Sequence, residues 1–457
     1  MPTGNPYDFC KRLKSKDKFG LVELLLAMER PAEALTLLQA LTLSWQKPLP
    51  TQIYYHTQIG LALKGVGRRG EAAQALIQAV AGIETLRRRV TVERTGFFQA
   101  GGLGGHLRSY RALVAVLAES AAQGESLPKP LKKYGPDPQT AAFYFAEATK
   151  GRVLLEAMAA GSRRSLSLQL PTELGQKEQQ LLDRLGALEA AWEKHYQQGE
   201  EALTKFKQQR EDLQKQLDEL VAQLRQKYPR YAAIHYPQPF KPQELPLKPD
   251  EVLLEYALGD KACYLIRVEA GGATKIFKIS AGREELEKLV KDFLKPLQNE
   301  KIREGFDAKK GHELYNLILA PALADLPPDK RLIIVPDGNL GELPFEALVL
   351  KPEEKYPDSV YVGDKWQMSY SQSATILALN RLLQASQAPK PLFALGNPVY
   401  KDTDLRYLAF QQGKAAPTVL AQAGPEAAFR APAAYRALGR TGSGDPKTRE
   451  AVFDPLP

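Results

Sequence analysis

The sequence predicts an α + α/β protein, with helical repeats at the N-terminus, a long helical hairpin in the middle and an α/β domain at the C-terminus. Three patterns predict this order. Apolar residues recur at helical spacing in the first hundred residues, leucines three or four positions apart run through 171–228, and short apolar runs between turn residues follow from 249. We expect the three parts at 1–165, 166–235 and 245–457.

The N-terminal part contains one helical pattern twice. Its members, with small or large apolar side chains, are Ala34, Leu38 and Leu41 in the first copy, and Ala72, Leu76 and Ala79 in the second. The offset of 72 − 34 = 38 residues is close to the roughly 34 of a tetratricopeptide repeat (TPR), whose second helix has this spacing. Gly60 and Leu63 fall at its first-helix positions. The pattern predicts a TPR-like α-solenoid.

Two more helices are expected at 107–122 and 139–160, and they would extend the core of the solenoid. The stretch between them, GESLPKPLKKYGPDPQ, is rich in proline, glycine and charge and is typical of an exposed connection. The glycines at 101–105 do not match a phosphate-binding fingerprint, because position 107 is a leucine and no Gly-Lys-Ser/Thr follows. We therefore expect a loop there and no cofactor.

The middle part is a charged amphipathic stretch. Its apolar positions are Leu174, Leu181, Leu185, Leu188 and Trp192, and then Leu203, Phe206, Leu213, Leu217, Leu220 and Leu224. Spacings of three and four are those of a coiled-coil seam. The break at Gln197-Gln198-Gly199 predicts an antiparallel hairpin that ends near Tyr228-Pro229. It is expected to be a spacer, with a dimer or partner contact as the alternative.

The C-terminal part opens with three short strands in EVLLEYAL, ACYLIRV and TKIFKIS, expected to form an antiparallel lead-in sheet. A helix over 286–297 and another near 314–318 follow. The run 332–335 is continuously apolar, which indicates a strand covered on both faces. Pro336-Asp337-Gly338 supplies a turn.

Beyond that turn, Pro344 suits a first helical turn. Ser373 is expected to cap a helix that carries Ile376 and Leu377. A second core strand is expected at 392–395, ended by Gly396-Asn397-Pro398. From about 430 the composition predicts a poorly ordered tail.

Taken in order, VPDG with LPFEAL, the Y-S-x-S segment at 370–373 and LGNPVY resemble the bacterial CHAT domain, a caspase- and separase-like cysteine peptidase fold that commonly follows TPR repeats. The A-E-x-x-K-G-R pattern that starts at Ala146 resembles the last helix before many CHAT domains. The resemblance implies a caspase-like α/β sheet and a cysteine endopeptidase ancestry.

The family places a catalytic histidine and a nucleophilic cysteine after the L-G-N-P segment. This sequence reaches Pro457 without either, so the resemblance assigns no catalytic residue and the chain is expected to be truncated and inactive. The cysteines present are Cys10, expected to be an idle thiol, and Cys263, expected to be a buried apolar residue in a strand. The last histidine is His312, in a helical pattern.

Composition sets the remaining expectations. A net charge of +9 from 62 basic and 53 acidic residues is spread along the chain, so nucleic acid is expected at most as a weak or indirect partner. Two cysteines, no signal pattern and no apolar run of about 18 residues favour the cytoplasm. The sequence has no G-x-S-x-G or H-E-x-x-H, and no metal or cofactor site is predicted.

Two functions remain open. In the first, the chain is the sensor and incomplete peptidase portion of a CHAT protein. In the second, it is a non-enzymatic adaptor. Both use the repeats to bind a protein partner. The strand at Leu332 is expected to be central in the fold and to have lost a neighbour, leaving a hydrophobic edge that a second chain would complete.

Overall fold

The structure is a computed structural model. It describes residues 15–41, 49–89, 105–150, 170–191, 195, 197–228, 231–232, 236, 238–298, 307–353 and 359–382. All of them belong to one unit, residues 1–384. Cys10, the expected strand 392–395 and the expected tail lie outside these residues.

The N-terminal region consists of helices that pack against their neighbours in the chain. They are α2 (Ser15–Ala27), α3 (Pro31–Ala40), α4 (Leu49–Gly65), α5 (Arg69–Arg89), α6 (Leu107–Ala122) and α7 (Pro138–Glu147). The repeated small residues allow close approach, since a Cβ built at Gly60 on α4 would lie 2.5 Å from Leu76 Cγ on α5. Ala34, Leu38 and Ala72 are fully buried, so this face of the predicted pattern is a core face.

The connection between α6 and α7 differs from the expectation of an exposed linker. It contains a 3₁₀ turn, η1 (Lys129–Tyr134), and its Leu127 and Leu131 side chains are buried. Because this segment is rich in proline and lysine, its composition did not indicate that two of its leucines are buried. Helix α7 starts where expected, with the Asp137 carboxylate accepting a hydrogen bond from Thr140 N at 2.7 Å. It ends at Glu147, and residues 151–160 of the expected helix lie outside the described residues.

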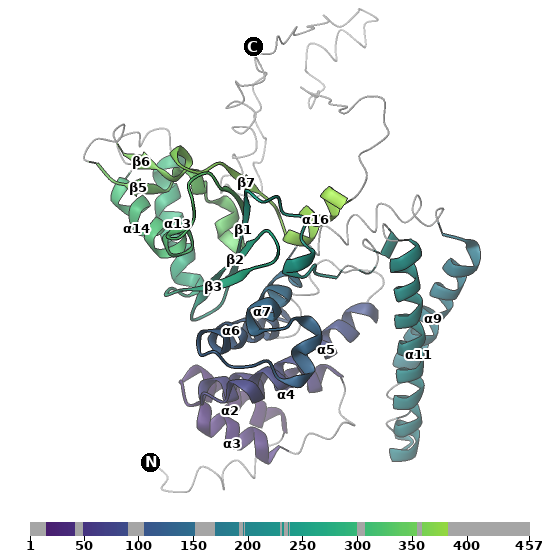
Figure 1. The fold of residues 1–457 in the computed structure, drawn as a ribbon. Helices are drawn as coiled ribbons and strands as arrows, with labels where there is room; N and C mark the ends of the chain where they lie inside the picture. Colours follow the sequence, from purple (N-terminus) through teal and green to yellow (C-terminus); the bar gives the residue numbers. More distant parts are fainter. Residues whose placement is uncertain are drawn as a thin grey trace, which may run out of the picture. The chain divides into compact units, whose positions relative to one another are not determined.

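The predicted hairpin is present as α9 (Thr172–Ala190) and α11 (Glu200–Lys227), which lie side by side (Figure 1). Their leucine stripes face each other and form a core of their own that includes Leu185 and Leu217. Gly199 precedes α11 with φ of 97°, a left-handed conformation that suits glycine, so the predicted break is confirmed. A buried carboxylate, Glu178, accepts hydrogen bonds from the Tyr231 and Tyr236 hydroxyls, both at 2.5 Å.

The C-terminal region is built on one five-stranded mixed sheet in the order β3-β2-β1-β4-β7. The strands are β1 (Glu251–Leu258), β2 (Cys263–Glu269), β3 (Thr274–Ile279), β4 (Arg331–Val335) and β7 (Met368–Tyr370). The three lead-in strands are antiparallel as expected, but they do not form a separate sheet, because β1 pairs in parallel with β4. Helices α13 (Arg283–Gln298) and α14 (Ala308–Ile318) lie beside this sheet (Figure 1).

Alternate residues of the central strands enter two different cores. On β4, Leu332 and Ile334 join the core that contains α13 and α14, whereas Ile333 and Val335 join the core that contains α6 and α7. Both faces of β4 are therefore covered, which confirms the interpretation of its continuous apolar run. Helices α6 and α7 cover one face of the sheet.

One expectation about β4 was wrong. Strand β4 has no open edge, because it pairs in parallel with β1 on one side and with β7 on the other. Pro344 precedes a helical turn, as expected, and this turn is a short 3₁₀ turn, η5 (Phe345–Ala347). It is followed by β5 (Val349–Lys351), which pairs with β6 (Val360–Tyr361). Tyr370 OH accepts a hydrogen bond from Phe345 N at 3.0 Å, which ties this turn to the end of β7.

Candidate functional site at the carboxyl ends of β1 and β4

The carboxyl ends of β1 and β4 meet at one edge of the sheet. The two strands are parallel neighbours, with Glu255 opposite Val335. The chain leaves β1 toward β2 on one side and leaves β4 toward β7 on the other. In open α/β sheets, a point where the strand order diverges in this way is the usual location of a ligand site.

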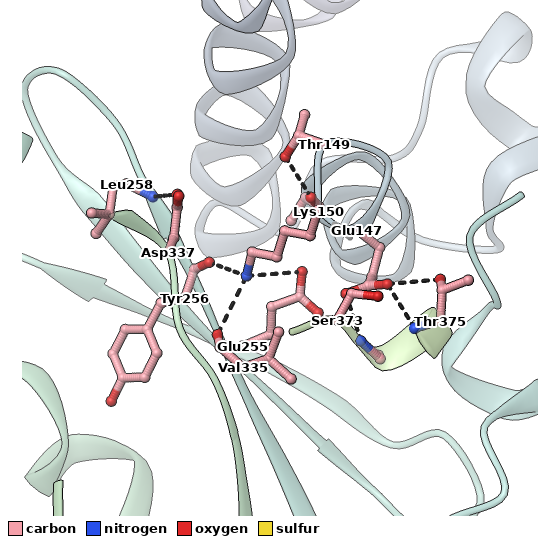
Figure 2. A network of polar contacts seen from close by, with 12 residues as sticks. Glu147, Thr149, Lys150, Glu255, Tyr256, Leu258, Val335, Asp337, Ser373 and Thr375 are labelled. Atoms are coloured by element: carbon pink, nitrogen blue, oxygen red, sulfur yellow. Dashed lines mark hydrogen bonds and ion pairs between the residues drawn. The ribbon is translucent and has the colours of Figure 1, made fainter. Parts of the chain in front are cut away.

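The turn after β4 is tied to the end of β1. The Asp337 carboxylate accepts a hydrogen bond from Leu258 N at 2.8 Å (Figure 2). Arg283, at the start of α13, donates through Nη2 to Leu258 O at 3.1 Å and lies 3.8 Å from Asp337 Oδ2. Gly338 takes a φ of 54°. The predicted turn residues therefore fix the two strand ends relative to each other.

Lys150, in the turn after α7, reaches this edge from the helical region. Its ammonium group donates to the main-chain oxygen of Tyr256 and to that of Val335, the latter at 3.4 Å (Figure 2). It also lies 3.4 Å from Glu255 Oε1, and its side chain is only 8% exposed. One cation thus binds the carboxyl ends of both strands.

Glu255 is a fully buried carboxyl group on β1. Burial raises its pKa well above the ordinary value, the nearby Glu147 carboxylate raises it further, and the Lys150 cation opposes both effects. Among the described residues, neither Glu255 oxygen has a hydrogen-bond partner beyond the ion pair with Lys150. The raised pKa favours the protonated carboxyl group, which removes the cost of a buried charge.

Glu147, the last residue of α7, holds the N-terminus of α16 (Ala374–Leu382). Its carboxylate accepts hydrogen bonds from Ala374 N and Thr375 N, both at 2.8 Å, and from the Thr375 hydroxyl at 2.7 Å. Ser373 caps the same helix, accepting from Ile376 N at 3.0 Å through its hydroxyl, as predicted. A carboxylate at a helix N-terminus is favoured by the free N–H groups and by the helix dipole.

Glu147 and Lys150 therefore form a two-point clamp, with the carboxylate on α16 and the ammonium on β1 and β4 (Figure 2). The groups of this clamp are buried and engaged with main-chain partners. Such an arrangement positions backbone elements and does not by itself supply a free nucleophile or base.

The other candidate residues lie elsewhere. Cys263 is buried on β2, its thiol faces Gly259 O at 3.8 Å, and burial raises its pKa to about 11. The predicted burial of this cysteine in a strand is confirmed. His312 lies on α14, as expected, and its Nδ1 is paired with Val349 O at 3.0 Å. Within the described part of the chain, no hydrogen bond links Cys263 to a histidine.

Sequence reasoning did not identify Glu147 and Lys150 as functional residues. A signal was available, because the two charges interrupt an otherwise apolar helix in TAAFYFAEATK, and both belong to the A-E-x-x-K-G-R pattern. An isolated charge in an apolar helix indicates a buried partner. The partners of Glu147 and Lys150 lie on α16, β1 and β4, far along the chain, so the pattern alone does not identify them.

Two other classes of site are absent from the residues that the structure describes. No helix there has the length and apolar character needed to cross a membrane. In the same residues, no three side chains of the metal-binding types converge on one point.

Comparison with known proteins identifies part of the chain. A family model of the CHAT domain matches residues 308–447, from α14 through β4, β7 and α16 and on beyond the described residues. The match supports a CHAT domain protein, and a CHAT domain is a caspase-like, peptidase-related domain. No curated protein matched the chain.

Proposed function

We propose, from the CHAT domain match at residues 308–447, that this chain is a bacterial TPR-CHAT protein that binds a protein partner through α2 to α7 in the cytoplasm. The observation that carries the proposal is the clamp formed by Glu147 and Lys150. It joins the last described residues of the helical region to the sheet edge at which caspase-like chemistry would be expected. Partner binding on the helices would be communicated to the sheet through this clamp.

The chain as given is proposed to be non-catalytic. Nucleophilic catalysis by cysteine requires an accessible thiolate beside a base. Cys263 is buried with a pKa of about 11, which supports a structural role. In this proposal the helical hairpin α9–α11 is a spacer, and the β7 edge of the sheet is where a further strand or second chain would pair.

A test of catalysis uses the full chain and an unfolded protein substrate such as reduced, alkylated casein. We expect no cleavage. Cleavage that disappears in the Cys10→Ala/Cys263→Ala double variant would show an active cysteine peptidase and contradict the proposal. Cleavage that persists in the double variant would reveal a chemistry independent of thiols and would contradict it equally.

A non-enzymatic adaptor is the second candidate, and the engaged state of the clamp favours it. Both functions need a partner on the helices, and Leu24 on α2 and Met28 in the turn that follows it are each 55% exposed. A partner captured by the immobilised full chain would be purified and titrated against a Leu24→Lys/Met28→Lys variant. We expect binding to fall at least tenfold, whereas Leu297→Lys on α13, where the leucine is 45% exposed, should bind as wild type. Equal loss in both variants would contradict recognition by the helices.

The two candidates differ in the effect that binding has on the sheet. In the sensor function, the bound partner changes amide hydrogen exchange at residues 256–258 and 335–338, where the clamp acts. In the adaptor function, protection changes are confined to α2 to α7. The same purified partner serves both measurements.

A further inference from the structure

A small cavity opens next to the clamp, between α6, α7 and the carboxyl end of β1. Its volume is about 70 Å³, and it is lined on one side by Tyr110, Arg111 and Thr149 and on the other by Leu258, Gly259 and Asp337. This volume exceeds that of one water site and is far below that of a drug-sized pocket. It can hold one small functional group.

Two of the charged groups at this cavity are already engaged. Lys150 is bound to the main-chain oxygens at the ends of β1 and β4 and lies beside Glu255. Asp337 accepts the Leu258 N–H and faces Arg283. Neither group is available for a ligand without breaking contacts that hold the sheet edge together.

Arg111 on α6 differs from both. Among the residues that the structure describes, no hydrogen bond or ion pair satisfies its guanidinium group, although the side chain is only partly exposed. Burial lowers the pKa of Arg111, the positive charge of Arg283 lowers it further, and Asp337, Asp260 and Glu287 oppose this. An arginine remains protonated under these conditions, so the cavity wall carries a half-buried cation that no described residue pairs with.

We propose that this cavity is a binding site for a single carboxylate group, which Arg111 binds through its planar guanidinium at the carboxyl ends of β1 and β4. The inference does not rest on the proposed function, since it requires neither a peptidase nor a partner on the helices.

The residues that line the cavity favour a carboxylate ligand. A guanidinium group donates two parallel hydrogen bonds to a carboxylate, and a charge-assisted bidentate pair is stronger than a neutral hydrogen bond. The aromatic Tyr110 and Tyr264 and the apolar Leu258 reduce the access of water to the pair. Because the cavity holds only a few atoms, the remainder of the ligand would lie outside it.

Two sources supply a carboxylate of this size: a free small acid, or an acidic side chain of a peptide. The full chain would be titrated at constant ionic strength with succinate, with an N-acetylated, C-amidated peptide carrying one glutamate, and with the same peptide carrying glutamine. We expect one of the two carboxylates to bind, and which one binds identifies the source. The glutamine peptide should bind at least tenfold more weakly than the glutamate peptide if the peptide is the ligand.

Three variants assign any binding to the cavity. Arg111→Met should reduce the affinity for the carboxylate by about tenfold or more. Arg111→Lys should reduce it by less, since lysine keeps the charge but loses the two parallel N–H donors of the guanidinium group. Arg108→Met is the matched control, on the same helix but outside the cavity lining, and should bind as wild type. If Arg111→Met does not fold, Arg111→Lys still tests the site. Binding that is unchanged in the Arg111 variants, or no binding of either carboxylate by wild type, would overturn the proposal.

Discussion

The carboxylate of Glu147 accepts two hydrogen bonds from Thr375, one from its backbone N–H at 2.8 Å and one from its hydroxyl at 2.7 Å. The two residues are 228 positions apart, yet both are buried. The contact places a charge of the helical region at the start of the helix that follows β7. It makes the orientation of α16 depend on α7.

Replacing Glu147 by glutamine tests the cap on α16. The amide keeps one acceptor oxygen but loses the charge, and its NH₂ group faces backbone donors, so we expect the free energy of unfolding to fall by about 2 kcal/mol. Urea denaturation measures this change. Glu33→Gln, an exposed residue paired with Arg30, is the matched control and should cost less than about 0.5 kcal/mol. A Glu147→Gln cost no larger than the control cost would mean that the cap contributes nothing to stability.

Replacing Lys150 by methionine removes the cation from the ends of β1 and β4. It leaves two carbonyl groups and the buried Glu255 without their partner, for which we expect a loss of about 3 kcal/mol. Adding Glu255→Leu should recover part of that loss, because the buried polar group is then gone as well. If the double variant loses as much stability as the sum of the two single variants, the two side chains are not coupled.

The raised pKa of Glu255 predicts a pH dependence of stability. Since its pKa in the folded protein lies above the ordinary 4.5, the folded state binds this proton more tightly than the unfolded chain does. The resulting stabilisation is fully present below pH 4.5 and is lost as the pH rises toward the folded-state pKa, by at most about 1.4 kcal/mol per pH unit.

Comparison with Glu255→Gln isolates this contribution, because glutamine does not titrate. The stability of wild type minus that of the variant should decrease as the pH is raised from 4.5 toward neutrality. A difference that is flat with pH, or that increases, would assign the proton to another group.

The burial of Cys263 predicts an unreactive thiol. With a pKa of about 11, only about one molecule in a thousand carries the thiolate at pH 8. In a Cys10→Ala background, we expect a disulfide reagent to label Cys263 after denaturation and not in the native protein. Rapid native labelling would place this thiol on an accessible surface.

Two glycines in the helical hairpin predict opposite effects of alanine. Gly199 has φ of 97°, so Gly199→Ala should destabilise by about 1 kcal/mol. Gly186 lies within α9, where an added Cβ would meet no atom within 4 Å, so Gly186→Ala should stabilise by about 0.5–1 kcal/mol. Thermal unfolding of both variants checks the signs, and effects of the same sign would contradict the conformation of the hairpin turn.

Local patterns were sufficient for most of the elements in the described residues. The apolar run at Leu332, the Ser373 cap and the break at Gly199 each depend on neighbours a few positions away, and each prediction was confirmed. The burial of Leu131 was not predicted, because a proline- and lysine-rich composition favours a solvated linker while burial is decided by the surface it meets.

The clamp could not be predicted in the same way. Lys150 binds carbonyls 106 and 185 residues later, and no rule of spacing links them. Strand pairing could not be predicted either. The sequence predicts a strand at β4, but it does not show that β1 and β7 are its neighbours.

The division of β4 between two cores has a consequence for how such chains can be recombined. Ile333 and Val335 share a core with Leu113 and Phe145 of the helical region, so the volumes of the two sides must match. A helical region exchanged for that of a relative would bring side chains shaped for another sheet. The two parts are therefore constrained to change together, and a functional chimera would require the helices α6 and α7 to be transferred along with the sheet that they cover.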